Sequence, residues 1–565
     1  MTVSAGWEAS TLRDEVRWLM LNADESNAEA LVGPGVFEAA AHQGVVENEA
    51  VFSRADAVVY IVLTILNFAA VSWGVAALVA DVGLTEPRFW LVVTVLLPTL
   101  VMWELRWLTL PTMRRPQPLA APVGARVAVV TTFVPAAESR EMLERTVRAL
   151  VALEYEHETW VLDEGDDPEV KLLCARAGAR YFTRHGRPHY NTARGPFQAR
   201  TKPGNINAWL HEVGFRSYEL VAMFDPDHVP RRDYLTRLLG YLRDPSVAFV
   251  QSPQLYYNQE ASFIARGAAE ETYAYYSSLE MAGYGSGFPV LVGCHTVHRT
   301  AALEEIGGLP PHEADDTAAT LLYLAHGWRG VYDPVPLAAG LTPVDWHGYL
   351  RQQRRWARSV LDLKLRWYPR LFSSLPGRVR VAAGLHGLYY FSGLAAPLVL
   401  AYLCYLLLSG QQPLSKGSSL LPLAVIIAVL ISCDFYRQRF YLRPRLEWGL
   451  HWRAMILKYA KWPWLVIALF DAVSGSTNRF DITAKKNVHA SRAVTVPHAL
   501  VGLAIGSVWV ISLLTDRHPD ALVQVIAAIA VLTSIAIAAT GFCRFPAPFD
   551  DSLSCWRTSE EQEAR

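Results

Sequence analysis

Two acidic clusters follow short apolar runs of the kind that form buried strands. The cluster "DEGDD" begins with Asp163, and "DPDH" contains Asp225 and Asp227. Two carboxylates one residue apart at the end of a strand are suitable oxygen ligands for Mg²⁺ or Mn²⁺ carrying a phosphate. A single D-x-D is weak, because acidic turns are common on protein surfaces. Two such clusters at the ends of two strands favour a metal site more strongly.

Two further segments carry charged residues that could take part in a reaction at such a metal–phosphate site. "HEADDTAATLLYLAHGW" places Asp315 and Asp316 at the start of a predicted helix. A carboxylate there could equally be a cap that favours the positive end of the helix. "QARTKPGNIN" places Lys202 beside a turn at Gly204. Such a turn suits close approach to a phosphate, and an ordinary surface loop has the same composition.

A third segment, "QQRRWARSV", combines Gln352, Arg355 and Trp356 a short way before a long apolar run. Arginines beside a membrane segment usually mark its cytoplasmic end. That role explains the arginines but does not explain the glutamine and the tryptophan. We assign no catalytic role to Arg354 and Arg358, which fit simple membrane-facing cations.

The elements that must position these residues form an α/β pattern in the middle of the chain. Continuous apolar strands alternate with helical patterns, which indicates a mostly parallel sheet covered on both faces. In such sheets ligands bind beyond the carboxyl ends of the strands, where the acidic clusters lie. The predicted strands are residues 127–133, 159–162, 219–224 and 247–251, and the clearest helices are residues 139–153 and 232–242.

The composition places this block in a membrane protein. The chain has 565 residues, of which 52% are hydrophobic and only 19% are charged, and this excludes a disordered protein. A formal net charge of −1 argues against a nucleic-acid-binding protein. The six cysteines have no paired spacing, so the sequence predicts reduced thiols and neither a disulfide framework nor a zinc site.

Six segments meet the length and apolarity of a membrane helix: residues 57–80, 89–108, 384–408, 419–435, 496–514 and 521–540. The distribution of arginines around them places the central block and both ends of the chain in the cytoplasm. Residues 448–474 are apolar but contain three basic residues and a proline in their first half. Because charges at the bilayer centre are costly, we expect an interfacial helix there. A seventh span is the alternative.

The motifs in order resemble the D, D-x-D, D, Q-x-x-R-W signature of processive family-2 glycosyltransferases, among them the cellulose, curdlan, chitin and hyaluronan synthases. "KPGNIN", "DPDHVP" and "FVQSPQLYYN" look like further family segments, and "FDITAK" (residues 480–485) looks like the family's gating loop. The resemblance covers residues 127–485 and is closest to bacterial cellulose synthase catalytic subunits. It implies a GT-A-like, mostly parallel domain inserted into a multi-pass helical membrane protein.

The resemblance also implies roles for the individual residues. Asp316 would be the general base, Trp356 would stack under the acceptor sugar, and Asp225 and Asp227 would hold Mg²⁺ or Mn²⁺. The remaining positions would bind the nucleotide sugar: Asp163, Lys202, Asp225, Gln352, Arg355 and, in the gating loop, Thr483 and Lys485. A direct displacement at the anomeric carbon would invert it and give a β-linked polymer from an α-linked donor.

Three departures from the family pattern bear on the acceptor and on the acidic positions. The family's D-D-G is Asp163-Glu164-Gly165 here, and its T-E-D ends in Asp315-Asp316. Both changes keep a carboxylate, so we expect the chemistry to survive. "LVGCHT" places Cys294 and His295 where cellulose synthases have other groups, which leaves the acceptor sugar open. A neutral, packed His295 is as consistent with the sequence as a ligand. After residue 540 no R-x-x-x-R occurs, so we expect no PilZ domain.

These expectations divide the chain into nine parts. They are a cytoplasmic segment (1–56), two membrane helices (57–110), the glycosyltransferase domain (120–365), interfacial helices (366–383), two membrane helices (384–435), an interfacial helix (446–475), a gating loop (476–490), two membrane helices (496–540) and a cytoplasmic tail (541–565).

The function that follows from the resemblance is synthesis and export of a β-glucan from UDP-glucose at the bacterial inner membrane. The expected partners are the UDP-sugar, the growing polysaccharide and membrane lipids, whereas accessory subunits are not specified. A chitin- or hyaluronan-type synthase using UDP-N-acetylglucosamine, or a non-processive transferase acting on a lipid acceptor, is the alternative. A pure transporter would not need the acidic series.

Overall fold

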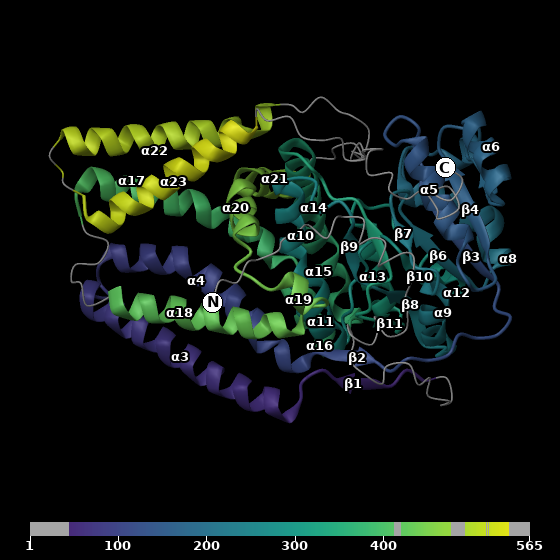
Figure 1. Cartoon of the computed structure of the whole chain (residues 1–565), viewed down its shortest axis with the longest axis horizontal. Helices are drawn as coiled ribbons and strands as arrows, with labels where there is room; N and C mark the ends of the chain where they lie inside the picture. Colours follow the sequence, from purple (N-terminus) through teal and green to yellow (C-terminus); the bar gives the residue numbers. More distant parts are fainter. Residues whose placement is uncertain (1–44, 412–419, 476–491, 516, 518, 542–565) are drawn as a thin grey trace, which may run out of the picture.

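The computed structural model describes residues 45–411, 420–475, 492–515, 517 and 519–541. Long helices lie side by side in one half of the molecule, and an α/β domain forms the other half (Figure 1). Between them lie α14 (Trp346–Arg366), α20 (Trp452–Ala460) and α21 (Trp462–Ser474). The predicted class, a helical membrane protein with an inserted α/β domain, is confirmed.

The α/β domain contains a seven-stranded sheet with the order β11-β8-β10-β6-β3-β4-β5. All its strands run in one direction except β10, which is antiparallel to both of its neighbours. The four strands predicted from apolar runs are β3, β4, β6 and β8, and each matches within about one residue. The bounds are β3 Val127–Phe133, β4 Glu158–Asp163, β5 Arg180–Phe182, β6 Leu220–Phe224, β8 Val247–Gln251, β10 Thr296–Arg299 and β11 Arg329–Tyr332.

The central strands are buried on both faces, which explains their unbroken apolar sequences. Every residue of β3, β6 and β8 is buried. Three strands of this sheet were not predicted, β5, β10 and β11. Strand β10 reads "TVHR", which has no apolar run by which to recognise it. Two small sheets complete the strands: β1 (Asn48–Ala50) with β2 (Arg114–Pro116), and β7 (Val229–Pro230), β12 (Ala338–Gly340) and β9 (Gln254–Tyr256).

The helices of the α/β half cover the sheet and connect its strands. They are α5 Arg140–Val151, α6 Pro168–Ala177, α7 Lys202–Trp209, α8 Phe215–Ser217, α9 Tyr234–Leu238, α10 Phe263–Ala274, α11 Glu280–Gly285, α12 Thr300–Glu305, α13 Asp315–Ala325, α14 and α15 Tyr368–Leu371. The remaining helices are α3 Arg54–Val82, α4 Pro87–Leu108, α16 Gly377–Leu385, α17 Ala395–Ser409, α18 Leu420–Arg437, α19 Pro444–Glu447, α20, α21, α22 Val496–Leu514 and α23 Ala521–Thr540.

Five helical segments among the described residues are long and apolar enough to cross a membrane. They are Arg54–Val82, Gly377–Ser409, Leu421–Phe440, Ala493–Leu514 and Ala521–Thr540. The predicted span at residues 89–108 is also helical, as α4, but is not among these five. It contains Glu104, which accepts hydrogen bonds from Asn67 of α3 at 2.8 and 2.7 Å. The number of membrane crossings stays a prediction.

The predicted interfacial helix is two helices that meet at Lys461. Pro463 lies in the first turn of α21, where its missing N–H costs nothing. The Lys461 ammonium donates to Glu271 of α10 at 2.9 Å and to Gln353 of α14 at 3.2 Å. Tyr349 donates its hydroxyl to the same glutamate at 2.5 Å. This buried ion pair joins the apolar helix pair to the α/β half of the chain.

Lys461→Met should therefore lower the free energy of unfolding by about 3–5 kcal/mol, because it leaves the Glu271 carboxylate buried without its cation. The matched control is Lys171→Met. Lys171 pairs with Asp166 at 2.7 Å on the surface, where both side chains are more than a third exposed, and a loss below about 1 kcal/mol is expected there. Thermal unfolding of both variants in detergent measures the difference. Equal midpoints would contradict the structural role of the buried pair.

Candidate active site

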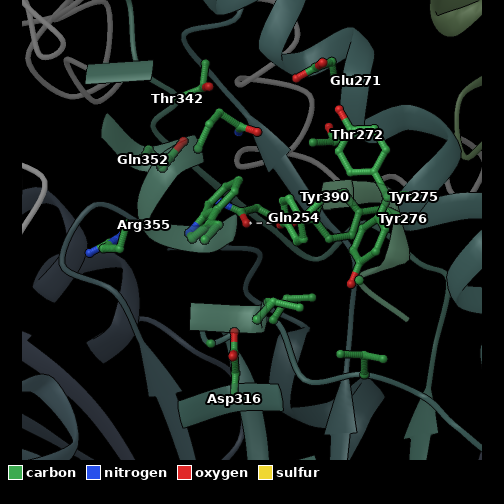
Figure 2. A pocket seen from close by; sticks show the side chains of 18 of the residues that line it. Gln254, Glu271, Thr272, Tyr275, Tyr276, Asp316, Thr342, Gln352, Arg355 and Tyr390 are labelled. Atoms are coloured by element: carbon green, nitrogen blue, oxygen red, sulfur yellow. Dashed lines mark hydrogen bonds between the residues drawn. The ribbon is translucent and has the colours of Figure 1, made fainter. Parts of the chain in front are cut away.

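A cavity of about 2470 Å³ runs from the carboxyl edge of the sheet to the membrane helices. Asp225 and Asp316 lie in its wall at the sheet end, and Trp103 and Arg106 of α4 lie in its wall at the membrane end. Figure 2 shows Gln352 and Arg355 on one side of this cavity, Tyr275, Tyr276 and Tyr390 on the other, and Asp316 at its base.

Lys202 connects three segments at the sheet end of the cavity. Its ammonium donates to Oδ1 of Asp225 and to the carbonyl oxygen of Gly293, each at 2.5 Å. Burial disfavours the charged lysine, but Asp225 and Asp315 more than offset this, so the pKa of Lys202 lies above its ordinary value. The lysine is therefore a fixed positive charge beside the D-x-D turn, as a phosphate-binding residue requires.

The turn containing Lys202 depends on a glycine. Thr201 caps α7 by accepting a hydrogen bond from the Gly204 N–H at 3.1 Å. A Cβ at Gly204 would lie 2.1 Å from the carbonyl oxygen of Gln198. No other residue fits there without moving the backbone, so the predicted glycine turn is a close approach of two chain segments.

The two carboxylates of the D-x-D turn have different environments. Asp225 is half-buried and faces the cavity, whereas Asp227 is only 2% exposed and accepts a hydrogen bond from the Leu341 N–H at 3.0 Å. Asp225, Asp227 and His228 each offer one ligand atom within 4.8 Å of the others. The two carboxylates fit Mg²⁺ or Mn²⁺, which prefer oxygen ligands. His228, which the sequence did not single out, also belongs to a second group of potential ligands with Cys294 and His295.

Asp315 and Asp316 begin α13, as the sequence predicted. Oδ1 of Asp316 accepts a hydrogen bond from the Thr317 N–H at 2.6 Å, so this carboxylate does serve the helix end. Its Oδ2 would lie 3.0 Å from a Cβ at Gly293, which shows how closely the Gly293 loop approaches it. Burial raises the pKa of both carboxyls, and the charge of Asp316 raises that of Asp315 further. A raised carboxyl pKa is typical of a general base.

Asp163 lies below the cavity wall. It is fully buried, and its carboxylate accepts hydrogen bonds from the N–H groups of Gly165 and Asp167 and from the hydroxyl of Tyr181. Burial raises its pKa despite these bonds. The residues that line the cavity in the described chain include the neighbouring Glu164 and omit Asp163. Asp163 thus shapes the turn after β4 in this structure, and its contact with a uridine stays a prediction.

Helix α14 presents Gln352, Arg355 and Trp356 to the cavity, because positions three and four residues apart lie on one helix face. Burial lowers the pKa of Arg355, although Glu313 and Asp225 oppose this shift. The sequence suggested that the other arginines of the motif are membrane-facing cations, but both form ion pairs with acidic residues of the chain. Arg354 donates to Asp471 of α21 at 2.7 Å, and Arg358 pairs with Glu313.

The tyrosines of the opposite wall were missed by the sequence analysis. Tyr275 and Tyr276 belong to the run "YAYY", in which the helix widens to a π-helix at Tyr275–Leu279. A π-turn is frequent at functional sites and changes which side chains share a face. The run of aromatic residues was the available signal, but helical periodicity alone does not aim it at the cavity. Thr483 and Lys485 of the predicted gating loop lie outside the described residues.

His295 has an uncharged ring, which fits both alternatives that the sequence left open, a packed residue and a ligand. It is fully buried, and burial together with the neighbouring His228 lowers its pKa to about 3. The adjacent Cys294 is also buried, and its thiol donates to Oε1 of Gln254 at 3.4 Å. Both residues lie beside the D-x-D turn.

Comparison with known proteins agrees with this geometry. Residues 126–359 match the family described as "Glycosyltransferase like family 2". The chain contains a family-2 glycosyltransferase domain. This domain covers the acidic series and the motif of α14. The chain is also 31% identical over 264 residues to the UDP-forming cellulose synthase catalytic subunit of Xanthomonas axonopodis pv. citri (strain 306), which covers 45% of this chain and 34% of that protein.

Other relatives extend beyond the glycosyltransferase domain. The corresponding subunit of Pseudomonas fluorescens (strain SBW25) is 26% identical over 363 residues, or 62% of this chain and 47% of that protein. The chain thus spans between a third and a half of the length of these two relatives. A mannosyltransferase from Pyrobaculum calidifontis has a solved structure with a TM-score of 0.46 and 18% identity, covering 69% of this chain and 99% of that one.

The raised carboxyl pKa values predict the pH dependence of sugar transfer by this domain. A general base must be unprotonated, so the rate should fall as pH drops through a pKa above the ordinary aspartate value of about 3.9. Asp315→Asn should leave this acidic limb in place, because the charge of Asp316 raises the pKa of Asp315, so Asp315 is already protonated when Asp316 titrates. Asp316→Asn should lower the transfer rate about 10²–10⁴-fold at every pH. Initial rates of UDP release measure both, and a limb unchanged by Asp315→Asn but lost in Asp316→Asn would assign the limb to Asp316.

The D-x-D geometry predicts the effect of Asp227→Asn on metal-dependent nucleotide binding. The amide oxygen can still accept from Leu341, so the fold is kept, but the anionic ligand is lost. Affinity for UDP in Mn²⁺ should fall at least about tenfold, with little change in the absence of metal. Asp233→Asn is the control, because Asp233 pairs with Arg231 outside the cavity wall. Titration calorimetry measures both, and an unchanged metal effect would disprove the assignment.

Proposed function

We propose that the chain is a membrane-embedded, processive, inverting glycosyltransferase that polymerises a β-linked glucan from UDP-glucose and passes it across the membrane. One observation carries this proposal. The cavity lined by Asp225 and Asp316 is also lined by Trp103 and Arg106 of α4. A transferase that releases its product after each step needs only a cleft for its acceptor, whereas a polymer that stays bound needs an exit from the transfer site.

The donor would bind at the sheet end of the cavity. Lys202 and Arg355 offer positive charge there, and the D-x-D turn lies between them and the sheet. A divalent ion held by Asp225 and Asp227 would neutralise negative charge that develops on the leaving diphosphate. The names of the bacterial relatives include a UDP-forming reaction, which supports a UDP-sugar as donor.

The acceptor would enter from the membrane side. Trp356 and the wall of tyrosines offer aromatic faces on which the apolar C–H face of a sugar ring packs. Asp316 would take the proton of the acceptor hydroxyl as that oxygen attacks the anomeric carbon, and the bond from this carbon to the diphosphate breaks. The product has gained one sugar with inverted configuration. It then has to move by one unit towards the membrane helices before the next transfer.

The fixed position of α14 supports this order of events. Its pocket-facing side carries the donor contact Arg355 and the acceptor contact Trp356 in adjacent positions. Arg354 and Arg358 anchor its flanks to Asp471 and Glu313. A helix held on both flanks keeps donor and acceptor groups in one geometry, which lowers the entropic part of the barrier.

Membranes containing the wild-type chain should convert radiolabelled UDP-glucose into a polymer that a β-glucan-specific hydrolase digests. UDP-N-acetylglucosamine and GDP-mannose are the competing donors, and Asp316→Asn membranes are the blank. Trp356→Ala should shorten the polymer more than it slows donor hydrolysis, because a stacking loss of roughly 1 kcal/mol falls on the acceptor. Trp448→Ala, at an exposed tryptophan outside the cavity wall, is the matched control.

Three results would reject the proposal in different ways. Polymer from UDP-N-acetylglucosamine alone would assign a chitin- or hyaluronan-type synthase. Labelled lipid with no polymer would assign a non-processive transferase. A parallel fall of polymerisation and hydrolysis in Trp356→Ala would make this tryptophan a packing residue.

A further inference from the structure

Three potential soft-metal ligands meet behind the D-x-D turn. His228 follows that turn, and Cys294 and His295 lie in the loop before β10. The two segments meet because β6 and β10 are antiparallel neighbours, with Met223 opposite Thr296. The side chains of the three residues each offer one ligand atom within 4.8 Å of the others. All three are at least nine-tenths buried, with exposures of 1%, 3% and 0%.

The hydrogen bonds of His295 fix which ring nitrogen is available. Its Nε2 lies 3.2 Å from the carbonyl oxygens of both Ser252 and Pro253, so this nitrogen carries the hydrogen. In a neutral ring Nδ1 then carries a lone pair, and Nδ1 has no hydrogen-bond partner among the described residues. An imidazole that donates one N–H to a backbone carbonyl and leaves the other nitrogen free is the arrangement typical of a metal-ligating histidine.

The ring of His228 also lacks hydrogen-bond partners. Neither of its ring nitrogens has a hydrogen-bond partner within the described chain, although Nδ1 lies 3.4 Å from Oδ1 of Asp227. Its ring centroid is 5.2 Å from that of His295. The ring packs against Gly340, where a Cβ would lie 2.4 Å from Nε2, so the histidine fills a space shaped for it.

A nearby histidine shows that this part of the sheet can satisfy a buried imidazole. His298 is 2% exposed, yet its Nε2 is 2.9 Å from the Thr296 hydroxyl and its Nδ1 is 3.1 Å from the Tyr323 hydroxyl. Simple packing would be expected to provide such partners for His228 and His295 as well. In addition, His295 has a φ of +33°, an unfavourable backbone conformation for a residue with a side chain. His295 thus combines backbone strain with a ring nitrogen, Nδ1, that has no hydrogen-bond partner among the described residues.

We propose that His228, Cys294 and His295 bind one Zn²⁺ ion, at a site separate from the Mg²⁺ or Mn²⁺ position at Asp225. A thiol that loses its proton to solvent on binding, together with two neutral imidazoles, is a ligand set for zinc and not for magnesium. Zinc bound to one sulfur and two nitrogens needs ligand atoms about 3.5 Å apart, so small side-chain rotations complete the site. Water would take the fourth position.

The site would hold the loop on which the transfer site depends. Gly293, directly before Cys294, accepts the hydrogen bond from Lys202 and lies against Asp316. The zinc ligands are thus positioning residues, which fix the loop and through it the lysine. Their role rests on metal binding and does not depend on the identity of the sugar.

The test is the metal content of the full chain purified in detergent without chelator. Plasma mass spectrometry should find one equivalent of zinc, and titration of metal-depleted protein with Co²⁺ should produce a thiolate-to-cobalt charge-transfer band. Cys294→Ser and His295→Gln should lose both the zinc and the band. Cys174→Ser is the matched control. The Cys174 thiol is also buried, with 1% exposure, and it lies in a different part of the core. Asp225→Asn should keep the zinc.

Two outcomes would overturn the proposal. Zinc retained by Cys294→Ser would show that the metal is bound elsewhere. Loss of zinc in Asp225→Asn as well as in Cys294→Ser would show a single metal site shared with the D-x-D turn. If a variant fails to fold, the cobalt titration of the wild-type chain tests the proposal. Absence of the thiolate-to-cobalt band would then show that the site does not exist. The experiment measures metal content and absorbance. Its result therefore does not depend on whether the chain synthesises a polymer.

Discussion

The half-buried ammonium of Lys202 makes the contacts on which the arrangement of the transfer site depends. It joins Asp225 at the end of β6 to the carbonyl of Gly293 in the loop before β10. Burial disfavours the charged form of this lysine, but its acidic neighbours more than offset that effect, so its pKa lies above the ordinary value. The same loop approaches Asp316 from the other side. One cation thus fixes the distance between the proposed donor-binding turn and the proposed base.

The second constraint is the junction between the catalytic domain and the apolar helices. Helix α14 uses its arginines for two purposes. Arg354 and Arg355 both line the cavity, and Arg354 also pairs with Asp471 of α21. Lys461 adds a buried link to Glu271. Ion pairs at a buried junction specify one docking geometry, since an unpaired partner would be costly to leave in an apolar environment.

The D-x-D turn lies between two environments of different chemistry. On the cavity side, Asp225 offers hard oxygen ligands that suit a divalent ion carrying phosphate. On the buried side, His228 faces a thiol and a second imidazole. Adjacent residues of one turn can therefore serve different metals, because ligand type and burial select the ion more strongly than position in the sequence does.

The sequence by itself predicted four of the seven strands of the main sheet and the order of the motifs. Apolar runs identified β3, β4, β6 and β8, because strands buried on both faces have unbroken apolar sequences. Asp225 was recognisable from the acidic pattern at a strand end, whereas the roles of Asp316 and Arg355 came from the resemblance to a known family. No such pattern exists for β10, whose four residues include a buried histidine.

Only the tertiary structure decided which groups meet across the sheet. The scattered cysteines predicted no zinc site, yet an antiparallel strand brings Cys294 to His228, 66 positions earlier in the chain. Likewise, only the fold shows that the Asp163 carboxylate accepts hydrogen bonds from two backbone N–H groups of the turn after β4. Spacing along the chain reports neighbours within one helix or strand. Contacts between segments far apart depend on strand direction and register, which this sequence does not encode locally.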